Sequence, residues 1–152
     1  MSILTSVKGG KIAIDRWEKQ AELQQQIRVW LEEHGVENKN YKLYLYSEEP
    51  LQYRIRVDGQ DVNLVGYQEE SLPDYITFEA ITGGSFFCSW SNLKTMRGFP
   101  KMVGNIFDIS HSSIESLENA PKIVDINYAA YGLNFTKEEI QAKTKVTCNI
   151  YC

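Results

Sequence analysis

The chain has 152 residues, a length that fits a single domain with its own hydrophobic core. Its formal net charge of −4 argues against a general nucleic-acid-binding protein, and no apolar run approaches the roughly 20 residues needed to span a bilayer. Residues 1–15 lack the features of a secretory signal and the three cysteines are an odd, sparse set. We therefore expect a cytoplasmic protein with free thiols and no nucleic-acid or membrane partner.

The first segment, residues 2–14, alternates weakly in hydrophobicity around Gly9 and Gly10. Adjacent glycines suit the positive φ angles of tight turns, so the pattern predicts a short hairpin. A phosphate-binding loop is not favoured, because Ile12 follows Lys11 where that motif requires Ser or Thr.

A helix is predicted over residues 16–34, starting after Asp15 with Glu18 three residues on and ending at Gly35. Its apolar face is formed by Leu23, Ile27, Trp30, Leu31 and His34. We expect this helix to cover the end of a repeat stack, with docking of a partner protein as the alternative.

Two alternating segments follow within residues 41–57, separated by a loop at residues 47–50, and predict an antiparallel β-hairpin. Asp58 and Gly59 then turn the chain into a short strand at residues 61–64.

The central stretch, residues 85–133, aligns with itself at a shift of 21 residues. Phe86, Cys88, Ser91, Leu93, Met96, Pro100, Lys101 and Val103 fall on Phe107, Ile109, Ser112, Ile114, Leu117, Pro121, Lys122 and Val124. Such a match indicates stacked repeats that bury one another's apolar faces. Traced in both directions, it predicts strands starting at 62, 86, 107 and 128, with extra length at residues 79–84 in the first unit.

Each unit follows the core pattern of a leucine-rich repeat, shown in full by residues 107–117, FDISHSSIESL. The two alternating apolar residues point a short strand into the core. Serine (Ser91, Ser112) stands where that repeat has an asparagine that hydrogen-bonds the bending backbone.

After the array, Thr136 and Glu139 form a capping-box pattern that predicts a helix over residues 137–143. Val146, Cys148 and Ile150 alternate with polar residues, which predicts one closing strand.

The text CSWSNLKTMRGFPKMVGNIFDISHSSIESLENAPKIV resembles the repeats of a family of tailed-phage proteins built on FxCSxNxLxSLxGxPxxVxGxFxCS. WLEEHGVENKNYKLYL, RVDGQDVNL and FTKEEI are similar to other parts of that family, so the resemblance covers roughly residues 27–140. It implies a phage origin and a short solenoid with one strand per repeat and loops on the return side. The family carries no established general activity or catalytic motif to transfer.

The expected fold is therefore α+β: a short leucine-rich-repeat-like β-solenoid of about four strand units, capped by an N-terminal amphipathic helix and a β-hairpin. Within the single domain, we expect residues 1–60 to form this cap, residues 61–133 the repeat array and residues 134–152 a C-terminal cap.

A binding surface is expected on the outer face of the repeat strands, where residues flanking the inward positions point to solvent. Its exposed aromatic and apolar side chains would anchor a protein partner, unless the hairpin or a terminus covers them. The predicted protein-binding residues are Phe87, Ser89, Ile106, Asp108, Ser110, Asn127 and Tyr131.

The sequence nominates no catalytic, cofactor-binding or metal-binding residue, and no cofactor. No Asp or Ser beside His111 forms a recognisable catalytic triad with it. His34 lies at the predicted C-terminal end of a helix, where a cation is favourable. Cys148 and Cys152 would need two further ligands to hold zinc.

We therefore expect a non-enzymatic protein-binding module, in which binding to, or inhibition of, a host or defence protein fits a small acidic phage product. A structural or assembly accessory that forms oligomers is the first alternative. An enzyme with a site in the cleft between cap and solenoid is the second.

Overall fold

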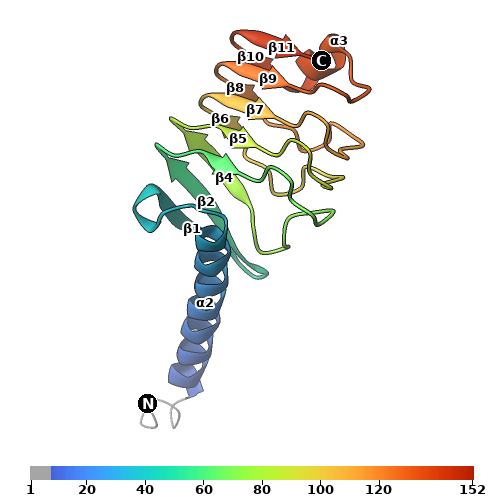
Figure 1. Ribbon diagram of the computed structural model, residues 1–152. Coiled ribbons are helices and arrows are strands. Elements are labelled where there is room, and N and C mark those ends of the chain that lie inside the picture. Colours follow the sequence, from blue (N-terminus) through green and yellow to red (C-terminus); the bar gives the residue numbers. More distant parts are fainter. Residues whose placement is uncertain (1–7) are drawn as a thin grey trace.

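The computed structural model describes the backbone of residues 8–152 and the side chains from Ile14 onward. Its main feature is a β-solenoid of about four turns built from two sheets (Figure 1). Sheet A contains, in spatial order, β1 (Tyr41–Glu48), β2 (Leu51–Asp58), β4 (Phe78–Thr82), β6 (Met102–Val103), β8 (Ile123–Val124) and β10 (Lys145–Val146). Sheet B contains β3 (Val62–Asn63), β5 (Phe86–Phe87), β7 (Ile106–Asp108), β9 (Asn127–Ala129) and β11 (Asn149–Tyr151).

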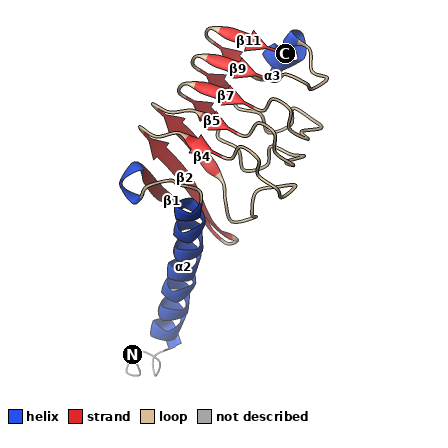
Figure 2. Cartoon of the chain, viewed as in Figure 1, coloured by secondary structure: helices blue, strands red, loops and turns tan. Residues whose placement is uncertain are grey.

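Each turn of the solenoid therefore places two strands, one in each sheet, where the resemblance implied one. The expectation of one strand per repeat is wrong because strands such as β6 have only two residues, too few to show alternation in the sequence. In the first unit, the extra length expected at residues 79–84 is mostly β4, a strand of sheet A. The return side between β5 and β6, and between β7 and β8, consists of loops, as expected (Figure 2).

The predicted inward positions of sheet B are confirmed. All eight are buried: Val62, Leu64, Phe86, Cys88, Phe107, Ile109, Tyr128 and Ala130. Three of these rings form a column through the core, with ring centroids 6.1 Å apart for Phe86 and Phe107 and 4.9 Å apart for Phe107 and Tyr128. This column links three successive turns of the solenoid.

The N-terminal helix α2 (Lys8–Glu33) starts earlier than predicted. The expected hairpin is wrong for residues 8–14, which are helical, and residues 2–7 lie outside the described part of the chain. The two glycines fall in the first turn of the helix. The N–H groups of a first helical turn have no acceptor within the helix in any sequence, so glycine at these positions breaks no intrahelical hydrogen bond. The predicted end is confirmed: Gly35 has a φ of 79°, and the Val36 N–H donates to the Leu31 carbonyl at 2.9 Å.

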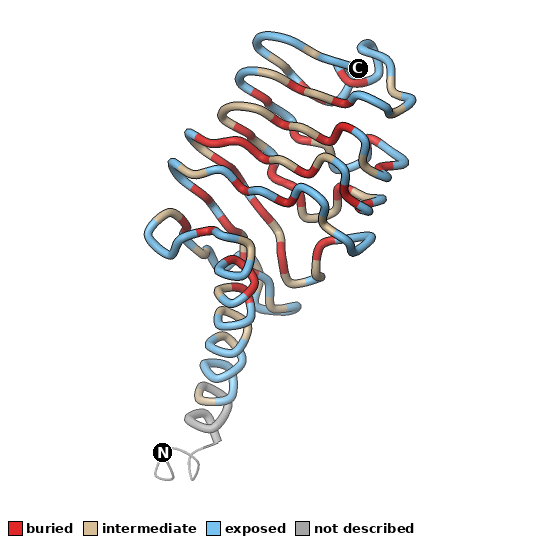
Figure 3. Tube along the Cα trace, viewed as in Figure 1, coloured by how far each residue is buried: buried red, intermediate tan, exposed pale blue. Residues whose placement is uncertain are grey.

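Among the described side chains of α2, those of its C-terminal half pack against the solenoid (Figure 1). Ile27, Trp30 and Leu31 are buried there, and the Trp30 ring lies 6.3 Å from that of Phe78. The helix projects away from the sheets toward its N-terminus (Figure 1), and residues 15–19 on it are exposed, with Trp17 65% accessible (Figure 3). The helix thus caps the apolar end of the stack over its last turns alone.

The β1–β2 hairpin is confirmed as antiparallel, with Leu43 opposite Ile55. It follows the short 3-10 helix η1 (Asn38–Asn40). Its second strand also pairs in parallel with β4, through Val57 and Ile81, so the hairpin extends sheet A as well as capping it.

At the other end, α3 (Lys137–Lys143) has the predicted capping box. The Thr136 hydroxyl accepts the Glu139 N–H at 3.1 Å, and the Glu139 carboxylate accepts the Thr136 N–H at 3.1 Å. The single closing strand is wrong: the chain turns at residues 147–148 between β10 and β11, which leaves Cys148 exposed. The alternation of apolar and polar residues continues in the sequence across this turn. Each strand is only two or three residues long, so the pattern shows no break between them.

The turn between β4 and β5 leaves no room for a side chain at Gly84, and this predicts a large loss of stability for Gly84→Ala. The added Cβ would overlap the carbonyl oxygen of Gln60 in the neighbouring turn, so the backbone must move. We expect the free energy of unfolding in urea to fall by about 3 kcal/mol.

Gly66→Ala is the matched control for Gly84→Ala. Gly66 has a φ of 75° with nothing within 4 Å of an added Cβ, so it tests backbone conformation without a clash. We expect it to lose about 1 kcal/mol. Equal losses for the two variants would contradict close contact between the turns.

Candidate binding surface

Parallel pairing in sheet B brings the outward residues of successive turns side by side. Phe87 on β5 lies beside Asp108 on β7, and Ile106 lies beside Asn127 on β9. All four are half-buried. The structure therefore brings these predicted residues together on one face of the solenoid.

Of the two predicted serines, Ser110 links neighbouring turns. Ser89 is half-buried and Ser110 is buried, and the Ser110 hydroxyl accepts the Tyr131 N–H at 2.9 Å. The Asp108 carboxylate accepts the Ser110 N–H at 2.9 Å. The Ser110 hydroxyl therefore links two neighbouring turns, whereas the Asp108 carboxylate stabilises the bend within its own turn.

Tyr131 is the most exposed of the predicted residues, at 48%. Its ring stacks on that of Tyr151 with centroids 5.9 Å apart. Tyr151 itself is 38% exposed and ends β11. Tyr151 was not predicted at this surface, because the alternation of Val146, Cys148 and Ile150 indicates one strand with Tyr151 outside it.

A second exposed aromatic pair, Trp90 and His111, was also missed. The Trp90 ring is 67% exposed and stacks on the His111 ring at a centroid distance of 4.2 Å and an interplanar angle of 19°. Backbone hydrogen bonds fix the pair to the next turn: Trp90 N–H to the Ser110 carbonyl at 3.0 Å, and His111 N–H to the Tyr131 carbonyl at 2.8 Å. This places the pair at the ends of β5 and β7.

Both residues of this pair have left-handed backbone conformations, with φ of 57° at Trp90 and 56° at His111. The equivalent positions in the flanking turns are Gly66 and Gly132, with φ of 75° and 77°. Glycine adopts this conformation without penalty, whereas other residues lose roughly 1–2 kcal/mol. The spacing of 24, 21 and 21 residues from Gly66 to Gly132 was the sequence signal that could have marked Trp90 and His111 as special.

We call the five side chains Phe87, Trp90, His111, Tyr131 and Tyr151 the aromatic face. Around it, the outward positions of the sheet B strands carry two charged side chains, Asp61 and Asp108, and both are acidic. The surface is therefore aromatic with a weakly negative border, a composition typical of the anchoring part of a protein interface.

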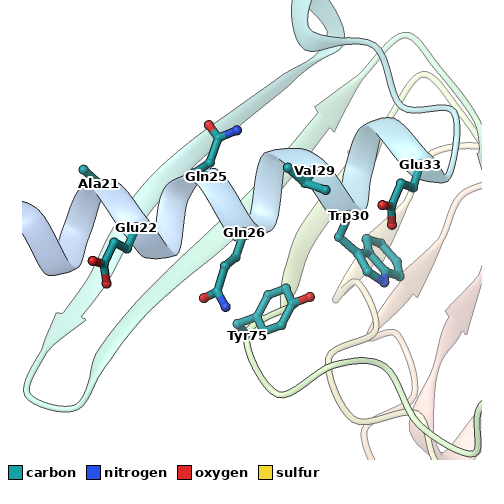
Figure 4. Close-up of a pocket in the computed structure, with 8 residues that line it drawn as sticks. All are labelled: Ala21, Glu22, Gln25, Gln26, Val29, Trp30, Glu33 and Tyr75. Atoms are coloured by element: carbon teal, nitrogen blue, oxygen red, sulfur yellow. The ribbon is translucent and has the colours of Figure 1, made fainter.

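The cleft between cap and solenoid is a shallow hollow of about 800 Å³ beside α2 (Figure 4). Gln26 and Trp30 extend from the helix toward Tyr75 in the loop before β4, whereas Gln25 points away (Figure 4). The remaining lining groups include the carboxylates of Glu22 and Glu33. The hollow is thus bounded by amides, carboxylates and aromatic rings.

The thiols are distributed between core and surface. Cys88 is buried and its pKa is raised far above the usual thiol value, because burial disfavours the thiolate. Burial likewise raises the pKa of the Tyr128 hydroxyl, which has no hydrogen-bond partner among the described residues. Cys148 and Cys152 are exposed. Within the described residues, no group of three or more His, Cys, Asp or Glu side chains is placed to hold a metal ion.

Comparisons with known proteins add no further constraint. No family model, curated protein or solved structure matches this chain. In the described part of the chain, neither helix combines the length and the apolar character needed to cross a membrane.

Proposed function

We propose that this chain is a non-enzymatic protein-binding module, and that the aromatic face is its binding surface. Its biological setting in this proposal is a phage infection, in which an accessory protein acts in the host cytoplasm and binds or inhibits a host or defence protein. The resemblance of residues 27–140 to tailed-phage repeats supports that setting.

The observation that carries the proposal is the strained, exposed Trp90–His111 stack. Two neighbouring turns place non-glycine residues at a backbone position that glycine occupies in the turns on either side. Strained conformations of this kind concentrate at functional sites, because the fold alone gains nothing from them. Trp90 presents most of its ring to solvent, and Trp and Tyr are the side chains most enriched among interface residues that dominate binding energy.

The test is co-purification of a tagged chain from phage-infected bacteria. We expect a stoichiometric foreign protein with the wild-type chain and at least a tenfold loss with Phe87→Asp/Tyr131→Asp, because buried aspartates at an interface core are strongly unfavourable (about 1.4 kcal/mol per tenfold). The measurement is the molar ratio of captured protein to bait.

The matched control is Tyr44→Asp/Leu45→Asp on β1. Tyr44 is 48% exposed, as Tyr131 is, and Leu45 is 45% exposed, but both lie on the hairpin. The control should capture the partner normally. Unchanged capture by the Phe87/Tyr131 variant would remove the aromatic face as the binding surface, and sedimentation as a large self-assembly without a foreign protein would favour the assembly alternative.

A further inference from the structure

A second surface of the molecule carries a concentration of positive charge. It lies on sheet A, where the chain enters successive strands, and borders a cavity of about 490 Å³. The basic side chains that line it are Arg54, Arg97, Lys101, Lys122 and Lys143, and we call this site the basic groove. Glu118 is the one carboxylate among the lining residues, so the groove is strongly positive in a chain whose net charge is −4.

The stacking of the turns arranges these cations in a row. The Lys122 N–H donates to the Lys101 carbonyl at 2.7 Å, which places the two lysines on adjacent turns, about 4.8 Å apart along the solenoid. Arg54 comes from β2, and Lys143 ends α3 just before β10. The groove therefore follows the solenoid axis across several turns, with roughly one cation for each.

The cations of the groove form no ion pair among the described side chains, although Glu118 also lines the groove. In the described side chains, the ion pairs within 4.0 Å are Lys39–Glu37, Arg56–Asp58 and Lys94–Glu70, and no groove residue takes part. Arg97 is fixed by hydrogen bonds to the carbonyls of Leu72 and Pro73. Like charges on adjacent turns repel one another, and an anion that bridges them would reduce that repulsion.

Arg54 is held beside the groove by an aromatic contact. Its guanidinium lies over the Tyr46 ring, 3.8 Å from the centroid, which restricts its orientation. Its Nε is buried and has no hydrogen-bond partner among the described residues. This buried atom is closed to a ligand, so an anion in the groove would meet the accessible part of the half-buried Arg54 side chain.

The size and charge of the groove select the class of anion. A volume of about 490 Å³ lies within the range of small-molecule sites and is too small for a folded partner. Several cations in a row match a compact ligand with three or more negative charges, and arginine and lysine are the side chains that bind phosphate oxygens. We propose that the basic groove binds the triphosphate group of a small molecule, either inorganic tripolyphosphate or a nucleoside triphosphate.

Isothermal titration calorimetry of the full chain tests this inference, with sodium tripolyphosphate and ATP as separate probes at about 50 mM salt, where charge interactions are weakly screened. If the phosphate chain alone is recognised, we expect both probes to bind with micromolar affinity. If the nucleoside also contributes, we expect ATP to bind with micromolar affinity and tripolyphosphate not to. Both results support the inference. Failure of both probes to bind at millimolar concentration overturns it.

Charge-reversal variants locate the site. Lys101→Glu/Lys122→Glu should weaken binding at least about tenfold, since it replaces two of the row of cations. Lys19→Glu/Lys42→Glu makes the same change in net charge at exposed positions on α2 and β1, outside the groove, and should leave affinity within about twofold. Equal losses in both variants mean a general charge effect and overturn the assignment. Circular dichroism of each variant checks that a loss does not reflect unfolding.

Discussion

Phe107→Ala is expected to lower the free energy of unfolding by about 3–5 kcal/mol, enough to unfold a marginally stable domain. Phe107 is fully buried at the centre of the aromatic column. Its ring contacts Phe86, Phe99 and Tyr128 at centroid distances of 6.1, 6.0 and 4.9 Å. Truncation leaves a cavity that three aromatic rings on adjacent turns cannot close without moving the backbone. Urea denaturation followed by circular dichroism measures the loss.

The matched control is Phe87→Ala, the same substitution on the opposite face of sheet B. Phe87 is half-buried and points outward beside Asp108, so its removal leaves no enclosed cavity. We expect a loss of about 1 kcal/mol or less. A Phe87→Ala loss equal to that of Phe107→Ala would contradict the inward and outward assignment of the sheet B strands.

The parts of this fold that could be predicted are those where one local pattern decides the structure. The inward positions of sheet B were predictable because each turn repeats the same apolar pair, as Phe86–Cys88 and Phe107–Ile109 do. The capping box at Thr136 was predictable because its two hydrogen bonds depend on residues three apart.

Sheet A beyond the hairpin was not predicted, because its short strands form only through pairing with strands of neighbouring turns. β6 and β8 are two residues long, and each is stabilised mainly by parallel hydrogen bonds to the strand in the next turn. Such strands have no periodicity of their own. The start of α2 was misassigned for a different reason: Gly9 and Gly10 indicate a turn locally, yet they lie in the first turn of a long helix.

The candidate surface was predicted in its position but not in its principal side chains. Alternation along the strands correctly places Phe87 and Asp108 on the outer face of sheet B. Trp90 and His111 follow the strands, where alternation no longer applies, and only their left-handed backbone directs the two rings against each other. That geometry depends on the glycine positions of neighbouring turns, which a pattern within one repeat does not contain.

Trp90→Gly is expected to reduce partner affinity at least about 30-fold, or about 2 kcal/mol, while leaving the chain folded. The substitution deletes the most exposed large ring of the aromatic face. It also places glycine at a left-handed backbone position, φ 57°, which Gly66 and Gly132 occupy in the flanking turns. The substitution therefore removes roughly 1–2 kcal/mol of backbone strain. The greater freedom of glycine in the unfolded chain and the lost stacking on His111 offset this gain, so the free energy of unfolding should change by less than about 1 kcal/mol.

Two further variants separate the ring from the backbone. Trp90→Ala deletes the same ring but keeps a Cβ in the left-handed conformation, so it should bind as weakly as Trp90→Gly and be about 1 kcal/mol less stable. Trp17→Ala removes a tryptophan of matched exposure, 65% against 67%, from the projecting half of α2, and should retain full affinity. Binding is measured as capture of the co-purified partner, and stability by urea denaturation. Full affinity in Trp90→Gly would refute the aromatic face as the anchor, and equal stability of the glycine and alanine variants would refute the strain that distinguishes this position from an ordinary exposed tryptophan.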